Sequence, residues 1–151
     1  MAALCERVLT DKDEVHSLVR VVNKFTIRGP APTMPGGICE FVAAIGLKRG
    51  DADRKHEFRL TCMAPNGNAI SDYVQQAEFP SPGGAETGLN FFLNVRLTVQ
   101  ETGCYWIHVL VDGRIATKIP FVIDYEQVQT GTHQAMPPAL TPSPPVRRKK
   151  R

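Results

Sequence analysis

Alternation of apolar and polar positions marks several segments of the chain. Between residues 89 and 99 the apolar side chains occupy the odd positions, and between residues 57 and 64 they occupy the even positions. A period of two is that of a β-strand with one buried face. Residues 18–28 and 69–79 show weaker forms of the same pattern, so we predict a strand in each.

Residues 38–47 are apolar on both faces, which predicts a central strand covered from two sides. Segments rich in proline and glycine separate the strands at residues 29–32, 65–67 and 80–88. No segment sustains a 3.6-residue apolar period. We therefore predict an all-β fold of about seven strands. The expected form is a two-layer antiparallel β-sandwich, immunoglobulin-like, with a small β-barrel as the alternative.

The strongest local signal is a β-hairpin whose two strands flank Asp112-Gly113. A two-residue turn would pair Val111 with Arg114, whereas a three-residue bulged loop would pair Leu110 with Arg114. We prefer the bulged loop, because it gathers apolar residues of both strands on one face. That face would hold Tyr105, Ile107, Val109, Ile115, Thr117, Ile119 and Phe121.

The same register turns Trp106, His108 and Leu110 away from the core and close to Lys118. Trp106 is the one tryptophan of the chain, and an exposed aromatic ring beside a cation can stack against a sugar, a base or a protein side chain. These four residues are the candidate binding site on the folded domain.

The amino-acid composition changes near residue 126. Five prolines lie between residues 137 and 145, and the chain ends in five cations: Arg147, Arg148, Lys149, Lys150 and Arg151. We predict a β-sandwich domain at residues 1–126 and a disordered proline-rich tail with a basic end at residues 127–151. The tail could make electrostatic contacts with nucleic acid or an anionic surface.

Charge outside the tail is nearly balanced. Without the last five residues, 13 of the 18 basic residues remain against all 15 acidic ones, for a net charge of −2. A dedicated nucleic-acid-binding domain usually presents a broad basic field. Any nucleic-acid contact is therefore expected from the tail.

Catalytic and metal-binding patterns are weak. Cys104 and His108 are four positions apart on a strand, about 13 Å, too far for a nucleophile and its base. Cys39 and Cys62 offer two zinc ligands at best. We expect no enzyme activity, no metal and no cofactor, and we expect Cys5, Cys39, Cys62 and Cys104 to be free core thiols. The sequence shows neither a signal peptide nor a transmembrane run, which favours a cytoplasmic protein.

Several short motifs are spread along the chain: Leu4-Cys5-Glu6, residues 21–35, Ala64-Pro65-Asn66-Gly67, Gly103-Cys104-Tyr105, Val111-Asp112-Gly113 and Ile119-Pro120-Phe121-Val122. Together they resemble a family of small uncharacterised bacterial proteins. The resemblance covers residues 4–125 and implies a β-sandwich and an intracellular bacterial origin, but no activity. Where the family has a glycine-containing turn after the second strand, this chain has Val22-Asn23-Lys24-Phe25.

The function predicted from these features is that of a non-enzymatic binding or interaction module. Its partner is expected to be a protein that contacts either a sheet edge or the face with Trp106. A nucleic-acid-associated accessory protein acting through the basic tail is the first alternative. A carbohydrate-binding module that uses Trp106 is the second.

Overall fold

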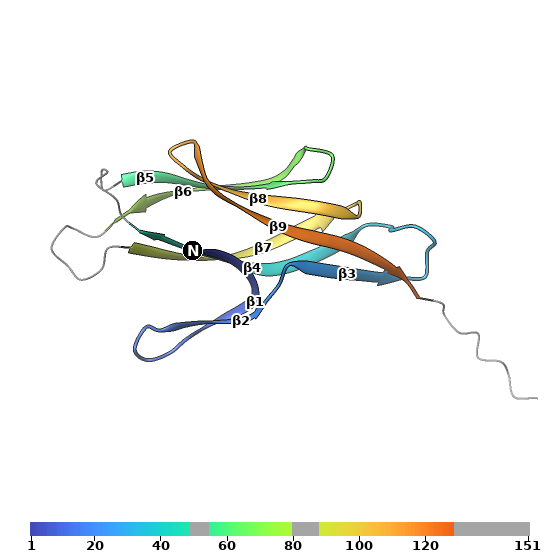
Figure 1. The fold of residues 1–151 in the computed structure, drawn as a ribbon, viewed down its shortest axis with the longest axis horizontal. Helices are drawn as coiled ribbons and strands as arrows, with labels where there is room; N and C mark the ends of the chain where they lie inside the picture. Colours follow the sequence, from blue (N-terminus) through green and yellow to red (C-terminus); the bar gives the residue numbers. More distant parts are fainter. Residues whose placement is uncertain (49–54, 80–87, 129–151) are drawn as a thin grey trace, which may run out of the picture.

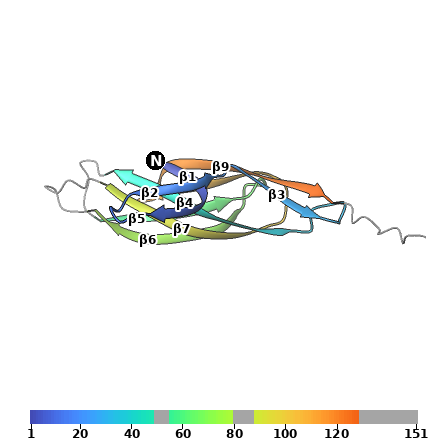
Figure 2. The ribbon, with the colours of Figure 1, turned by 90° about the horizontal axis from the view of Figure 1, so that it is seen from below.

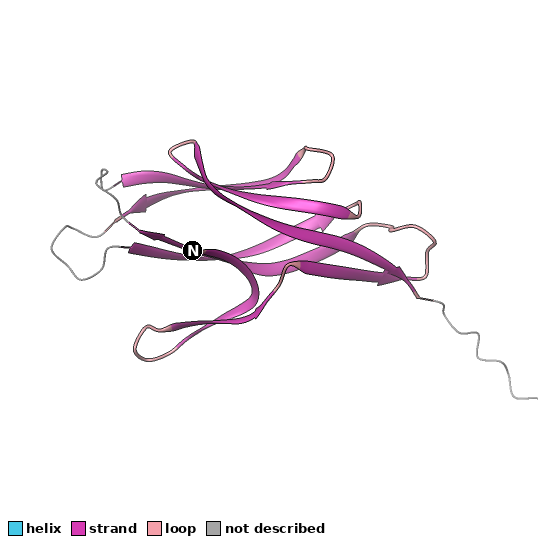
Figure 3. Cartoon of the chain, viewed as in Figure 1, coloured by secondary structure: helices cyan, strands magenta, loops and turns pink. Residues whose placement is uncertain are grey.

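The computed structural model describes residues 1–48, 55–79 and 88–128, and these residues form nine β-strands and no helix (Figures 1 and 3). The strands are β1 (Ala2–Thr10), β2 (His16–Val21), β3 (Lys24–Gly29), β4 (Gly37–Lys48), β5 (Lys55–Met63), β6 (Ala69–Glu78), β7 (Gly88–Val99), β8 (Gly103–Val111) and β9 (Arg114–Gln127). The predicted all-β class is confirmed, with nine strands in place of about seven. Among these described strands the predicted antiparallel pairing has one exception, because β3 pairs with β9 in parallel.

The strands form two sheets that enclose one main core. The order is β2-β1-β4-β7 in the four-stranded sheet and β3-β9-β8-β5-β6 in the five-stranded sheet. Figure 2 shows both sheets running along the long axis of the molecule. Both sheets contribute large buried side chains, among them Leu4, Ile45, Phe58, Tyr105 and Phe121. Phe58 of β5 stacks on Phe91 of β7 across the core, with ring centroids 4.6 Å apart.

The N-terminal part of the chain differs most from the prediction. Strand β1 was not predicted, and the single strand predicted at residues 18–28 is wrong. Two strands lie there, in different sheets, because the backbone at residues 22 and 23 crosses between them. The Val22 N–H donates to the Leu4 carbonyl at 2.8 Å, and the Asn23 carbonyl accepts from the Val122 N–H at 2.9 Å.

The four-stranded sheet curls on itself. Cys5, Val42 and Ala44 form a small second cluster of buried residues, apart from the main core. The ring of His16 on β2 packs edge-on against Phe92 on β7 at 4.6 Å, although these strands are the two ends of the sheet. This curl covers β4 on its second side, which confirms the prediction that residues 38–47 form a central strand.

The hairpin between β8 and β9 has the simpler of the two predicted turns. Val111 pairs with Arg114, and Asp112 and Gly113 have φ angles of 50° and 73°. Two successive positive φ values are those of a type I′ turn. The predicted three-residue loop is therefore wrong.

A bulge farther along β9 still produces the predicted faces. Leu110 pairs with Ile115 and Val109 with Thr117, so Ala116 is the extra residue. Beyond the bulge, odd positions of β8 oppose odd positions of β9, as expected. Ile115 lies before the bulge and is 51% exposed, so its predicted place in the core is also wrong.

Candidate functional site

The outer surface of the five-stranded sheet brings the predicted site residues together. Trp106, His108 and Leu110 alternate with buried residues of β8 and share one face, and Lys118 of β9 lies directly opposite His108. Trp106 points away from the core, as the predicted faces require, and is 39% exposed, although the predicted turn is wrong. We call this surface the Trp106 face. It comprises Trp106, His108, Leu110, Lys118, Pro120, Met63, Thr61, Arg59, Asp72 and Val74.

Trp106 is the centre of a row of apolar side chains. Pro120 of β9 lies opposite it on one side and Met63 of β5 on the other. Side chains directly opposite in neighbouring strands have Cβ atoms about 5 Å apart, so Pro120 and Met63 can each contact Trp106 from opposite sides. The row presents a continuous apolar strip with an aromatic ring in its middle.

A polar row lies next to the apolar one. It runs from Lys118 through His108 and Thr61 to Asp72, one residue from each of four adjacent strands. Partial burial lowers the pKa of His108 below its ordinary value of 6.5, and the nearby Lys118 lowers it further. His108 is therefore predominantly neutral at pH 7, which leaves one cation and one anion at opposite ends of the row.

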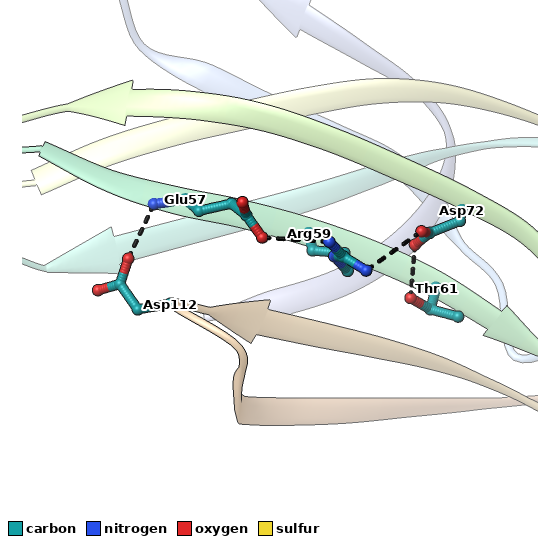
Figure 4. Close-up of polar contacts among 5 residues, drawn as sticks. All are labelled: Glu57, Arg59, Thr61, Asp72 and Asp112. Carbon is teal, nitrogen blue, oxygen red and sulfur yellow. Dashed lines mark hydrogen bonds and ion pairs between the residues drawn. The ribbon is translucent and has the colours of Figure 1, made fainter.

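Arg59 occupies the third row, between Leu110 of β8 and Val74 of β6. Its guanidinium lies 3.3 Å from Glu57 Oε1 and 3.5 Å from Asp72 Oδ2 (Figure 4). The Thr61 hydroxyl donates to the second oxygen of Asp72 at 2.7 Å. This network holds Arg59 flat along the sheet and balances its charge.

One donor of this network lacks a partner. Arg59 Nε is buried and makes no hydrogen bond. Arg59 nevertheless keeps 40% of its side chain exposed. Nε is covered and cannot reach a bound group, but the exposed part of the guanidinium can still donate hydrogen bonds or stack through its plane.

Residues 1–124 of the chain match the model of a family of unknown function, DUF6941. The chain belongs to this family. The DUF6941 match includes every residue of the Trp106 face and ends within β9. A search of curated proteins found no match.

Sequence reasoning identified four residues of the Trp106 face, all on the hairpin: Trp106, His108, Leu110 and Lys118. It missed Pro120 of the same hairpin and every residue on β5 and β6. Arg59, Thr61 and Met63 were visible as the polar side of the alternation at residues 57–64. The alternation could not reveal the strand order, which places β5 next to β8 and β6 next to β5. The five cations Arg147, Arg148, Lys149, Lys150 and Arg151 lie outside the described residues.

The described part of the chain contains no group of three or more His, Cys, Asp or Glu side chains placed to hold a metal ion. Within those same ranges no helix is long and apolar enough to cross a membrane. All four cysteines are free, but Cys104 is exposed on the outer side of β8, so its predicted core position is wrong.

Proposed function

We propose that this protein is a non-enzymatic binding module that recognises another protein through the Trp106 face. The observation that carries the proposal is the apolar row in which exposed Trp106 and Pro120 lie beside half-buried Met63 on the outer surface of the sheet. A partly exposed tryptophan flanked by apolar side chains is typical of the energetic centre of a protein interface.

The surroundings of Trp106 favour a protein partner over a sugar. Aromatic rings, methionine and arginine are enriched in protein interfaces, and the Trp106 face offers one of each. A sugar-binding ring is usually flanked by hydrogen-bonding groups for hydroxyls, whereas Pro120 and Met63 are the cross-strand neighbours of Trp106. The ion-paired residues around the strip suit the polar rim of an interface.

The alternative of nucleic-acid contact depends on residues 137–151. A chain that lacks them tests this alternative directly, because the rest of the chain is nearly neutral. Salt-dependent retention of DNA or RNA that is unchanged by the deletion would exclude the tail as its cause.

An immunoglobulin-like sandwich is part of the proposal. The Tyr105 hydroxyl donates to the Glu101 carbonyl at 2.9 Å, a contact like the tyrosine corner of that fold. A cytoplasmic, bacterial setting is also part of it. Four free cysteines, three of them buried, suit a reducing compartment.

Substitution of Trp106 tests the proposed interface. Trp106→Ala should weaken binding of the natural partner by about 2 kcal/mol or more, since it removes the proposed centre of the contact. The matched control is Leu9→Ala, which truncates a 51% exposed apolar residue on the other sheet.

The measurement is crosslinking and affinity capture from the native host with the wild-type chain and both variants as bait. The proposal requires a protein that is captured by wild type and Leu9→Ala but lost with Trp106→Ala. Capture of the same proteins by all three baits would exclude the Trp106 face. Binding on a glycan array that depends on Trp106 would favour the carbohydrate alternative.

A further inference from the structure

Strand β6 is an outer strand of the five-stranded sheet, with β5 on one side and no other described strand on the other. Both the N–H and the carbonyl of Glu57 point toward the β8–β9 turn, where they bond to Asp112. Backbone groups alternate sides along an antiparallel strand, so those of Phe58 and Leu60 point toward β6. They pair with the backbone groups of Gln75 and Tyr73 of β6.

It follows that the N–H and carbonyl groups of Asp72, Val74 and Gln76 point away from the sheet. Such a row of backbone groups is a template for a further strand. Proteins usually protect such edges with lysine, proline, a bulge or a short strand.

The other outer strands carry such protection. Strand β2 is interrupted at Arg20, whose φ is 51°, and β3 is six residues long and precedes Pro30. Strand β7 bears Arg96 and is partly covered through the contact of Phe92 with His16. The ten residues of β6 include no lysine, arginine, proline or glycine, and its one bulge, at Ile70, lies near the start of the strand, before the stretch from Asp72 to Gln76.

The surface of β6 is apolar for a solvent-facing edge. Ile70, Tyr73 and Val74 are 40%, 42% and 46% exposed. The one charge in the middle of the strand, Asp72, is already balanced by Arg59 and bonded by Thr61. Another β6 strand can therefore approach without charge repulsion.

A groove accompanies this edge on the core side. It has a volume of about 240 Å³ and lies between β6 and β7, with Leu60, Tyr73, Leu93 and Val95 among its lining residues. Side chains of an added strand that point to the core side would lie over this groove, where they could bury apolar surface.

We propose that β6 pairs antiparallel with β6 of a second copy of this chain, around a two-fold axis, so that the two five-stranded sheets join. The pairing requires an axis at Tyr73 or at Val74. An axis at Asp72 would oppose two aspartates, and an axis at Gln75 would oppose Asp72 and Glu78. At Tyr73 or Val74, Asp72 instead lies opposite Val74 or Gln76 of the other copy.

Proline at an outward-pointing N–H tests the pairing. Val74→Pro removes a bond to the second copy, twice by symmetry, while the bonds between β5 and β6 remain. Gln76→Pro does the same at the next outward position. Val74→Ala is the matched control, because it shortens the side chain and keeps the N–H.

The measurement is sedimentation of the full chain over a range of concentrations, with circular dichroism to show that each variant is folded. We expect a dimer that dissociates on dilution, whose dissociation constant rises at least about tenfold in Val74→Pro and Gln76→Pro. Val74→Ala should change it only a few-fold, and Trp106→Ala should leave it unchanged, which separates this interface from the apolar row of Pro120, Trp106 and Met63.

Three results would overturn the proposal. The first is a wild-type chain that stays monomeric at every concentration. The second is a dimer that persists in folded Val74→Pro and Gln76→Pro. The third is a monomer that dimerises only after deletion of residues 129–151, which would assign β6 to the tail of its own chain.

Discussion

Asp112 and Glu57, 55 residues apart in the sequence, exchange two hydrogen bonds. The Asp112 N–H donates to the Glu57 carbonyl at 2.8 Å. The Glu57 N–H donates to the Asp112 carboxylate at 2.9 Å, the bond drawn in Figure 4. His56 Nδ1 lies 2.6 Å from the other carboxylate oxygen. The β8–β9 turn is thus fastened to the start of β5, and the hairpin that carries Trp106 is held at its tip.

Asp112→Ala should destabilise the protein more than Asp112→Asn. Alanine loses both side-chain bonds and is strained at a φ of 50°, whereas asparagine tolerates that conformation and can still accept from the Glu57 N–H. Urea unfolding of the two variants and wild type measures the difference. Equal stabilities of the two variants would show that the hydrogen bonds of the side chain at position 112 contribute little to stability.

The contribution of Asp112 to stability should depend on pH. The hydrogen bond with His56, followed by that from the Glu57 N–H, lowers the pKa of Asp112 below its ordinary value of 3.8. The stabilisation is therefore complete above the ordinary value and is lost as the pH falls through the lowered pKa. The difference in unfolding free energy between wild type and Asp112→Asn should shrink from pH 7 to about pH 2. A constant difference would contradict this.

Gly103→Ala should destabilise the protein by about 1–3 kcal/mol. Its φ is 137°, and an added Cβ would lie 3.0 Å from Cγ of Pro65. The matched control is Gly113→Asn, since nothing lies within 4 Å of a Cβ there and asparagine accepts its φ of 73°. Thermal unfolding should separate the two variants, and equal melting temperatures would refute the steric argument.

Tyr105 and Trp106 are neighbours with opposite expected roles. Tyr105 is 1% exposed, so Tyr105→Phe should cost about 0.5–1.5 kcal/mol through loss of the bond to Glu101. Trp106→Ala should lower the unfolding free energy by less than the loss of about 3–5 kcal/mol that is typical when a buried tryptophan is truncated. A large loss of stability in Trp106→Ala would indicate a structural role for Trp106 and weaken the proposed interface.

The four cysteines should differ in reactivity. Burial, with a smaller contribution from Cys39, raises the pKa of Cys62 to about 12, and burial also raises the pKa of Cys5 and Cys39. Only Cys104 is exposed. A thiol reagent should modify Cys104 in the native protein and the other three only after unfolding. Cys104→Ser should abolish the native reaction.

The N-terminal strands show why part of the fold escaped prediction. In β1, Leu4 and Cys5 are adjacent and both buried, because the curled sheet covers both faces there. Such a strand has no alternation to detect. The change of sheet at residues 22 and 23 depends on bonds to Leu4 and Val122, and the local sequence holds no sign of either contact.

The sequence by itself determined that Trp106, His108 and Leu110 point outward, because the alternation along β8 is a local property of the chain. Only the tertiary structure decided how the hairpin achieves this. Bonds from β5 to Asp112 favour the two-residue turn, and a bulge at Ala116 then restores the apolar face. The tertiary structure also decided that Arg59 and Met63 lie in the site, because strand order arises from packing between distant segments.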